Sequence, residues 1–384
     1  MADLVIVALS GGVDSAVAAW LLRRAGRPVE GLFMANWDAS DDDRYCTLAR
    51  DFQDARSVAR ELGIVLHKVN FAAQYRATVF ESFLAELRAG RTPNPDVWCN
   101  REIKFGLCLQ YARRLGARRL ATGHYARLSG SGADVELHKG ADPNKDQSYF
   151  LHAVPRAQLA AAEFPLGELT KEAVRELARR AGLPVHDKPD STGICFIGER
   201  PFGEFVSRWL AQAPGPIVDA AGRRLGTHRG LAYYTIGQRS GLGLGGRSGA
   251  ITAPWFVAGK DPAANRLIVV QGHDHPLLYS RGCSVRGWHW LVDDPPAGAQ
   301  VQVKLRYRQA DQVATLSALR DDAGVLEFAV PQRAVTPGQF AVLYRGSRCL
   351  GGGVIEAPLP LAASADDIAI IRGARAAPAA WENR

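Results

Sequence analysis

A glycine-bearing hexapeptide near the N-terminus is the first candidate for chemistry. It reads Ser10-Gly11-Gly12-Val13-Asp14-Ser15 and directly follows an apolar run. Glycines let a backbone approach a ligand closely, and the first turn of a helix presents free N–H groups and a positive dipole end to an anion. The hexapeptide is neither a Walker A loop nor a G-x-G-x-x-G turn. It therefore predicts an anion-binding turn of another kind.

A second stretch combines two prolines with a carboxylate and a thiol, in the order Pro93-Asn94-Pro95-Asp96-Val97-Trp98-Cys99-Asn100. The prolines fix a stiff, extended segment, which suits a site that must hold a reactive group in place. Cys99 could act as a nucleophile if a neighbouring positive charge or a helix N-terminus lowers its pKa. The same pattern also fits the entry of a helix that carries an ordinary buried cysteine.

A third stretch places a cysteine between glycines, in the order Asp190-Ser191-Thr192-Gly193-Ile194-Cys195-Phe196-Ile197-Gly198-Glu199-Arg200. A buried loop cysteine fits this pattern as well as a reactive one does. Sulfur transfer proceeds by attack of a thiolate on a neighbouring sulfur, so a persulfide carrier and a resolving thiol must meet. Cys99 and Cys195 could meet at the edge of one domain, but the sequence alone does not show that they do.

The other four cysteines are interpreted as packing residues, because scattered cysteines in a reducing compartment are usually small buried hydrophobes. They are Cys46, Cys108, Cys283 and Cys349. No C-x-x-C pair is present, so the sequence gives no support to a zinc ribbon or a cysteine-ligated iron–sulfur cluster. We predict no metal site built from protein ligands alone.

The N-terminal half alternates between strand and helix patterns. The apolar run 4–9 predicts a buried parallel strand, and a helix is expected from about Asp14 to Ala25, ended by Gly26. Further strands are expected over 29–34, 64–69 and 117–122, and further helices over 47–62 and 75–89. This alternation predicts an α/β fold with a doubly wound sheet.

The pattern changes near residue 200, where glycine, proline and short alternating runs replace the helix signals. From about residue 283 onward, short strands recur between turns, which predicts a small β-barrel or sandwich. Within this region cations alternate with apolar residues. The cationic or polar positions are Gln302, Lys304, Arg306 and Arg308, and the apolar ones are Val301, Val303, Leu305 and Tyr307. On a strand this predicts a cationic face, which could track a phosphate backbone or simply be a solvated outer face.

Composition and net charge indicate the general class of protein. The chain has 384 residues, of which 47% are hydrophobic and 22% are charged, the balance of an ordinary globular protein. The net charge of +8 fits a nucleic-acid partner, although many basic proteins bind none. No apolar run is long enough to span a membrane, and we expect a cytoplasmic location.

The hexapeptide resembles the PP-loop of the ATP pyrophosphatases, which cleave ATP to AMP and pyrophosphate. Together the three stretches resemble the bacterial tRNA-specific 2-thiouridylases of the MnmA type. The resemblance covers about residues 4 to 360. It extends to the segments 30–34, 121–125, 144–150, 237–239 and 350–353.

The resemblance implies a fold of three parts. They are a PP-loop, Rossmann-like parallel-sheet domain over 1–200, a small central domain over 201–280, and a C-terminal β-barrel domain over 281–384 whose tail from about 361 lies outside the resemblance.

The resemblance also implies roles for individual residues. ATP would contact Ala8, Leu9, Ser10, Gly11, Gly12, Val13, Asp14 and Ser15 with its phosphates, and Met34 and Gly123 with its nucleoside. The target base would contact Asn94, Pro95 and Asp96, and other parts of the tRNA would contact His124, Lys145, Asp146, Gln147, Arg306, Tyr307 and Gln339. Cys99 would be a catalytic cysteine and Cys195 would carry the persulfide.

The implied reaction is chemically coherent. Adenylation would turn the 2-carbonyl oxygen of the wobble uridine into a leaving group, and the persulfide on Cys195 would then attack that carbon. Cys99 would next attack the persulfide sulfur, leaving a Cys99–Cys195 disulfide and 2-thiouridine. Asp96 is a candidate for handling the uracil N3 proton, and Mg²⁺ is expected with the nucleotide. The implied partners are the anticodon stem-loop region of tRNA and a persulfide donor, such as a cysteine desulfurase or a sulfur-relay protein.

Two alternatives remain. An amide-forming PP-loop ligase would pass the adenylate to nitrogen and would need neither Cys99 nor Cys195. A tRNA-binding protein without catalysis would bind tRNA in a salt-dependent way but would consume no ATP.

Overall fold

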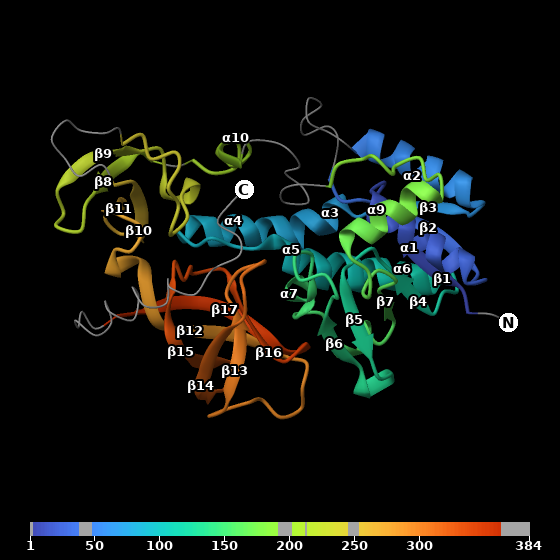
Figure 1. Ribbon diagram of the computed structural model, residues 1–384. Helices are drawn as coiled ribbons and strands as arrows, with labels where there is room; N and C mark the ends of the chain where they lie inside the picture. Colours follow the sequence, from blue (N-terminus) through green and yellow to red (C-terminus); the bar gives the residue numbers. More distant parts are fainter. Residues whose placement is uncertain (1–2, 38–47, 191–201, 212, 245–252, 362–384) are drawn as a thin grey trace.

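The computed structural model describes residues 3–37, 48–190, 202–211, 213–244 and 253–361 (Figure 1). Its first sheet is parallel throughout and has the strand order β3-β2-β1-β4-β7. The strands are β1 (Val5–Ala8), β2 (Val29–Ala35), β3 (Leu66–Asn70), β4 (Arg119–Ala121) and β7 (Ala162–Glu163). This arrangement confirms the predicted doubly wound α/β class.

Helices cover both faces of this sheet, which explains why β1 is apolar without alternation. Val5 and Val7 pack with α1 (Val13–Arg24), α2 (Leu48–Leu62) and α9 (Lys171–Arg180), whereas Ile6 belongs to the core on the opposite face. The helices that contribute to that second core include α3 (Ala72–Tyr75), η2 (Arg76–Phe80), α4 (Glu81–Arg88), α5 (Pro95–Trp98), η3 (Cys99–Cys108), α6 (Leu109–Arg114), α7 (Ser148–Leu151) and α8 (Arg156–Leu159). Of these, η2 and η3 are π-helical.

The order of the strands creates a switch point. The chain runs from β1 outward through β2 to β3, and then returns to place β4 on the other side of β1. In open α/β sheets, ligands bind in the crevice at the carboxyl ends of the strands where the order reverses. The residues after Ala8 and after Ala121 therefore meet at the expected binding edge.

The central part of the chain forms a small sheet in the order β10-β11-β8-β9. Its strands are β8 (Gly215–Val218), β9 (Arg224–His228), β10 (Trp255–Asp261) and β11 (Arg266–Gln271). Its own core includes Ile217, Val257 and Leu267. The helix α10 (Phe202–Ser207) precedes it, and the short 3₁₀ turns η5 (Leu231–Tyr233) and η6 (Pro276–Leu278) complete this region.

The C-terminal part forms a closed β-barrel, because β12 pairs with both β15 and β17. The barrel strands are β12 (Tyr279–Trp290), β13 (Gln300–Lys304), β14 (Gln312–Arg320), β15 (Ala323–Arg333), β16 (Phe340–Arg345) and β17 (Arg348–Pro360). A hairpin from the N-terminal half extends the barrel sheet, since Arg348 of β17 pairs with His138. It consists of β5 (Ala126–Ser129) and β6 (Glu136–Lys139), with the 3₁₀ turn η4 (Gly132–Asp134) between them.

One sequence prediction about the barrel is wrong. The alternating run 301–308 was expected to form a single strand with a cationic face, but β13 ends at Lys304. Lys304 is buried and donates to the Asp146 carboxylate at 3.0 Å, and Arg308 has a positive φ of 64°. The alternation could not reveal this buried ion pair, because its acidic partner lies 158 residues away in the chain.

Within the described residues, no helix combines the length and the hydrophobicity that a membrane span requires.

Candidate functional site

The glycine hexapeptide forms the turn between β1 and α1. Gly12 is the N-cap residue of α1 and has an extended backbone, with a φ of −98°. No side-chain hydrogen bond caps the helix at this position. Ser15 holds the turn instead, because its hydroxyl donates to the Gly12 carbonyl at 3.0 Å and accepts from the Ser10 N–H at 3.2 Å. The first N–H groups of a helix have no partner within the helix, so this turn presents donors and a positive dipole end to an anion.

Gly11 is required by its surroundings. Its φ is 77°, and a Cβ atom there would lie 2.2 Å from the main-chain oxygen of Asp51. Lys188 also stabilises this turn, because its ammonium donates to the Gly11 carbonyl at 3.0 Å. The same ammonium contacts the carboxylates of Asp51 at 2.7 Å and Asp54 at 2.5 Å. Burial alone would lower the pKa of Lys188, but its hydrogen bonds to the two carboxylates raise that pKa above its usual value.

Gly123 brings the loop after β4 against the first turn of α1. A Cβ atom at Gly123 would lie 2.8 Å from the main chain of both Asp14 and Ser15. The sequence predicted that Gly123 and the hexapeptide share one site, and the structure places them in contact at the switch point. Met34, the other residue predicted near the nucleoside, is half-buried near the end of β2.

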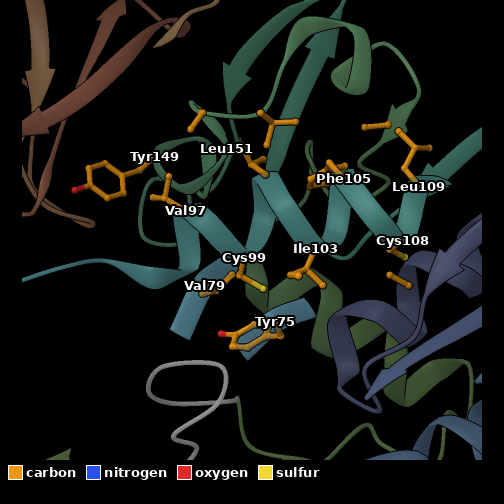
Figure 2. Packing of buried hydrophobic residues seen from close by; sticks show 14 of the residues in the cluster. Tyr75, Val79, Val97, Cys99, Ile103, Phe105, Cys108, Leu109, Tyr149 and Leu151 are labelled. Atoms are coloured by element: carbon orange, nitrogen blue, oxygen red, sulfur yellow. The ribbon is translucent and has the colours of Figure 1, made fainter. Parts of the chain in front are cut away.

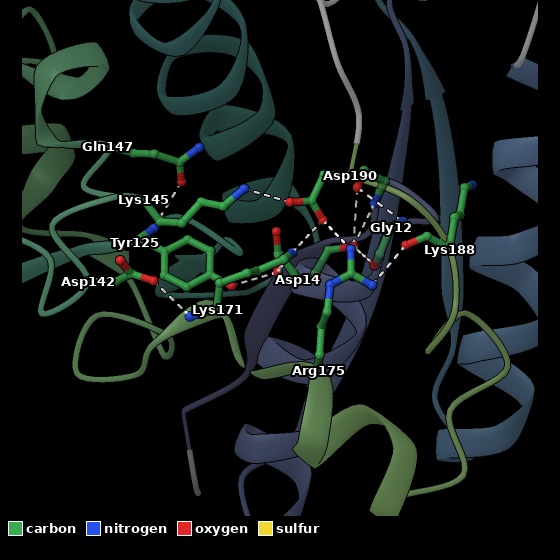
Figure 3. A network of polar contacts seen from close by, with 12 residues as sticks. Gly12, Asp14, Tyr125, Asp142, Lys145, Gln147, Lys171, Arg175, Lys188 and Asp190 are labelled. Atoms are coloured by element: carbon green, nitrogen blue, oxygen red, sulfur yellow. Dashed lines mark hydrogen bonds and ion pairs between the residues drawn. The ribbon is translucent and has the colours of Figure 1, made fainter. Parts of the chain in front are cut away.

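A cluster of charged side chains surrounds the start of α1 (Figure 3). We call it the Asp190 cluster. It consists of Asp14, Asp190, Lys145, Lys171 and Arg175. Lys171 lies between the two carboxylates, with Nζ at 2.7 Å from Asp14 Oδ1 and 2.7 Å from Asp190 Oδ1. Arg175 contacts Asp190 Oδ1 at 2.7 Å, and Lys145 contacts Asp190 Oδ2 at 2.6 Å.

These contacts keep the Asp190 carboxylate ionised. Burial raises the pKa of Asp190, but hydrogen bonds from Lys145 and Lys171 outweigh it and bring the pKa to about 2. The Tyr125 hydroxyl donates to Asp14 at 2.7 Å. Burial and the negative charge of Asp14 raise the pKa of Tyr125 far above its usual range, so the phenol stays protonated as a donor.

The segment that carries Asp96 and Cys99 begins with Asn94, whose extended backbone precedes Pro95 at the first turn of α5. Pro95 is buried and Asp96 is half-buried. Cys99 begins the π-helix η3, a form of helix that is frequent at functional sites. The residue is 1% exposed and lies in the cluster that includes Tyr75, Val79 and Ile103 (Figure 2).

Cys195 lies outside the described residues, and so does Cys46. The predicted approach of Cys195 to Cys99 therefore stays a prediction. The three other cysteines are buried, as the packing interpretation predicted, and burial raises the pKa of each to about 12. They are Cys108, Cys283 and Cys349. A thiol with such a pKa is a poor nucleophile at neutral pH, because almost none of it is thiolate.

The residues predicted to contact tRNA from the N-terminal half have different environments. Lys145 is one of the cations on Asp190, and Gln147 accepts from the Tyr125 N–H at 3.0 Å. Asp146 is buried, and its carboxylate accepts from the N–H groups of Gly140 and Ser148 and from Lys304. His124 is also buried, with Nδ1 at 2.7 Å from the Thr122 hydroxyl. Burial and the charge of Lys104 lower the pKa of His124, which keeps its imidazole neutral.

Those predicted from the barrel lie at junctions between the parts of the chain. One guanidinium nitrogen of Arg306 donates to the carbonyls of Ile236 and Ala334 and to the Thr336 hydroxyl. Gln339 donates to the main-chain oxygen of Thr92 at 2.8 Å. Tyr307 packs on Phe150, with ring centroids 4.5 Å apart.

Sequence reasoning assigned no role to Lys171, Arg175, Lys188 or Asp190. Lys171 and Arg175 come from α9, and Lys188 and Asp190 come from the loop that precedes residue 191. Lys171 and Lys188 bond to residues of the hexapeptide that lie 157 and 177 positions away in the chain. The one available signal was the charge pair of Lys188 and Asp190, the second of which begins the third stretch.

The parallel sheet, with its glycine turn at the switch point, defines an α/β protein of the PP-loop class. The family described as "tRNA methyl transferase HUP domain" matches residues 3–199, "tRNA methyl transferase PRC-barrel domain" matches 203–271, and "Aminomethyltransferase beta-barrel domain" matches 280–355. A solved structure of a 4-thiouridine synthetase–RNA complex with bound ATP is 18% identical, covers 54% of this chain and 49% of its own, and has a TM-score of 0.33, too low to bear on activity.

The curated relatives match nearly the whole chain. The "tRNA-specific 2-thiouridylase MnmA" of Methylibium petroleiphilum is 54% identical over 92% of this chain and 98% of its own length. Proteins of the same name from Acidovorax ebreus and Verminephrobacter eiseniae are 54% and 55% identical, over 92% and 91% of this chain and 98% and 97% of their own. The chain belongs to the family of tRNA-specific 2-thiouridylases. Two of the matching domain descriptions name a tRNA methyl transferase. The family assignment rests on the full-length relatives, because each of them matches nearly the whole chain.

Proposed function

We propose that this protein is a tRNA-uridine 2-sulfurtransferase that uses ATP to convert the wobble uridine of tRNA to 2-thiouridine. The observation that carries the proposal is the identity of 54% with curated 2-thiouridylases over 92% of the chain. The hexapeptide supports it independently, because its turn and the contact between Gly123 and α1 provide a place for a nucleotide at the switch point.

In the first step, the 2-carbonyl oxygen of the uracil attacks the α-phosphate of ATP and releases pyrophosphate. The residues Ala8 to Ser15 hold the phosphates, and Met34 and Gly123 lie beside the nucleoside. Mg²⁺ bound with the nucleotide would neutralise part of its charge. The described carboxylates at the start of α1 already pair with cations, so we assign none of them as a magnesium ligand.

In the second step, the terminal sulfur of a Cys195 persulfide attacks the activated carbon, and AMP leaves with the former carbonyl oxygen. The Cys99 thiolate then attacks the Sγ atom of Cys195, which forms a Cys99–Cys195 disulfide and leaves the sulfur on the base. An external thiol reduces the disulfide before the next cycle. Because Cys99 is 1% exposed, its attack requires the side chains around it to rearrange.

Further parts of the proposal concern recognition. Asn94, Pro95 and Asp96 contact the base, and Asp96 handles the N3 proton. The anticodon stem-loop region contacts His124, Lys145, Asp146, Gln147, Arg306, Tyr307 and Gln339. For the buried Asp146, such a contact involves its main chain, because its carboxylate is committed to three donors.

We also propose that the sulfur arrives from a persulfide donor, such as a cysteine desulfurase or a sulfur-relay protein, and that the reaction takes place in the cytoplasm. The domain boundaries proposed for the chain lie near residues 200 and 280. They are supported by the three sheets, whose strands fall mainly into the ranges 5–163, 215–271 and 279–360.

A thiolation assay tests the proposal. The protein is mixed with unmodified tRNA, Mg²⁺, ATP and a persulfide source, and the tRNA is resolved on a mercury-containing gel that retards thiolated RNA. We expect ATP-dependent retardation that is lost in Cys195→Ser and Cys99→Ser. The matched control is Cys283→Ser, a buried barrel cysteine, which should remain active.

Three outcomes would contradict the proposal. AMP release without retarded tRNA, while persulfide is plentiful, would keep the ATP site and rule out sulfur transfer. ATP consumption by Cys195→Ser at the rate of the unaltered protein, again without thiolated tRNA, would favour an adenylating ligase instead, and salt-dependent tRNA binding with no ATP consumption would favour a non-catalytic tRNA-binding protein.

A further inference from the structure

The Asp190 cluster has an excess of cations. Lys145, Lys171 and Arg175 carry three positive charges and Asp14 and Asp190 carry two negative ones, which leaves a net charge of +1. All three cations converge on the single carboxylate of Asp190, at 2.6 to 2.7 Å. The three cations bind this carboxylate through charge-assisted hydrogen bonds, which are the interactions they would also make with a bound anion.

The cluster lies at the anion-binding turn. Lys171 is the first residue of α9, which packs against α1, and its ammonium reaches Asp14 in the first turn of α1. The side chain of Lys171 is only 11% exposed, so its charge is directed inward, toward the start of α1, and not to solvent. Figure 3 shows Lys145 and Arg175 reaching Asp190 from opposite sides, close to Gly12.

A nucleoside triphosphate brings several negative charges to this turn. The main-chain N–H groups of a helix start supply only a partial positive charge, roughly half an elementary charge. Additional cations are needed to hold a pyrophosphate group, and lysine and arginine are the side chains that provide them. Among the described residues, the cations bonded to Asp14 or to Asp190 are Lys145, Lys171 and Arg175.

We propose that Lys171 and Arg175 bind the β- and γ-phosphates of ATP, and that Asp190 is an internal anion that competes with these phosphates for the two cations, while Lys145 keeps the tRNA contact proposed above. This inference rests on the proposed use of ATP and adds the residues that hold the leaving group. On binding, the phosphates replace the Asp190 carboxylate as the partner of the cations, so part of the binding free energy is spent on breaking its contacts.

Competition from Asp190 has a measurable consequence for phosphate binding. Removing the charge of Asp190 eliminates the competitor, so phosphate-bearing ligands should bind more tightly and not more weakly. If Asp190 merely supported the local structure, its loss would loosen the cluster and weaken binding. The two roles therefore predict opposite signs.

Isothermal titration calorimetry on the full chain provides the test, with α,β-methylene-ATP, inorganic pyrophosphate and adenosine as the probes. In Asp190→Asn we expect the Kd for the first two ligands to fall by about tenfold, because hydrogen bonds to charged groups are involved, and the Kd for adenosine to stay unchanged. Lys171→Met should raise the Kd for the same two ligands by tenfold or more. Asp219→Asn, which breaks an ion pair with Arg223 in the central sheet region, is the matched control and should change nothing.

Asp190→Ser serves as a second variant and should also tighten binding. Unchanged or weaker binding of pyrophosphate by both Asp190 variants, with circular dichroism spectra like that of the unaltered protein, would overturn the inference while leaving the proposed function intact. If the unaltered protein bound no ATP analogue at all, both proposals would be overturned.

Discussion

The side-chain amide of Gln339 donates a 2.8 Å hydrogen bond to the main-chain oxygen of Thr92, across 247 residues of sequence. A second bond runs beside it, from the Thr92 N–H to the carbonyl of Pro337 at 2.9 Å. The C-terminal barrel thus holds the stretch that leads to Asp96 and Cys99. The position of the proposed catalytic segment depends on the barrel and not only on the domain that contains it.

This relationship predicts that Gln339→Ala slows sulfur transfer without weakening ATP binding. One neutral hydrogen bond contributes about 1 kcal/mol, so we expect a decrease in rate of about fivefold. The thiolation rate and the Kd for an ATP analogue would be measured together. Gln302→Ala removes a comparable 2.8 Å bond elsewhere in the barrel and serves as the control. Equal rates for the two variants would contradict the prediction.

Gly123→Ala should abolish or severely reduce ATP binding. The new methyl group would lie 2.8 Å from the main chain of Asp14 and Ser15, and backbone cannot move aside as a flexible side chain can. We expect the first turn of α1 to shift and its N–H groups to lose their alignment. The control is Gly259→Ala, where the nearest atom would be at an ordinary 3.6 Å. Nucleotide titration would separate the two variants, and similar affinities would show that the contact is tolerated.

Lys188→Met should destabilise the protein and weaken nucleotide binding together. It leaves the carboxylates of Asp51 and Asp54 without their shared cation and frees the Gly11 carbonyl. We expect a loss of about 1–3 kcal/mol in the free energy of unfolding, measured by urea denaturation. Adding Asp54→Asn to Lys188→Met should recover part of the loss. A double variant less stable than Lys188→Met alone would argue against repulsion between the two carboxylates as the cause.

His152 should make stability fall as the pH is lowered from about 6.5 to 4. Its ring is buried against Phe340, and burial lowers its pKa from 6.5 to about 4, although its Nδ1 bond to the Tyr149 carbonyl opposes this change. Between these two pH values the unfolded chain binds a proton that the folded chain does not, so stability rises with pH across this window. The total effect is about 3 kcal/mol.

The measurement for this prediction is the free energy of unfolding at several pH values. His152→Gln should flatten the slope between pH 4 and 6.5 relative to the unaltered protein. The control is His186→Gln, since the side chain of His186 is 38% exposed. Identical slopes for His152→Gln and the unaltered protein would assign the acid sensitivity to other groups.

The local features of this fold could be predicted from the sequence alone. The apolar run that became β1, the glycines of the turn and the cap at Gly26 are short-range features, because strand burial, helix starts and positive φ values depend on neighbouring residues. The sequence also predicted that Gly123 belongs with the hexapeptide, although only through the resemblance of both segments to a known family. The doubly wound sheet followed from the alternation of strand and helix.

Contacts between residues far apart in the chain became known only from the three-dimensional structure. Lys304 was expected on a solvated or RNA-facing strand, but it lies buried on Asp146, because a distant carboxylate stabilises a buried cation that its own strand cannot. The pairing of the β5–β6 hairpin with the barrel sheet could not be predicted from the sequence either, because strand pairing depends on three-dimensional proximity. Lys171 gained its place between Asp14 and Asp190 only when α9 packed on α1, and no spacing along the sequence records that distance.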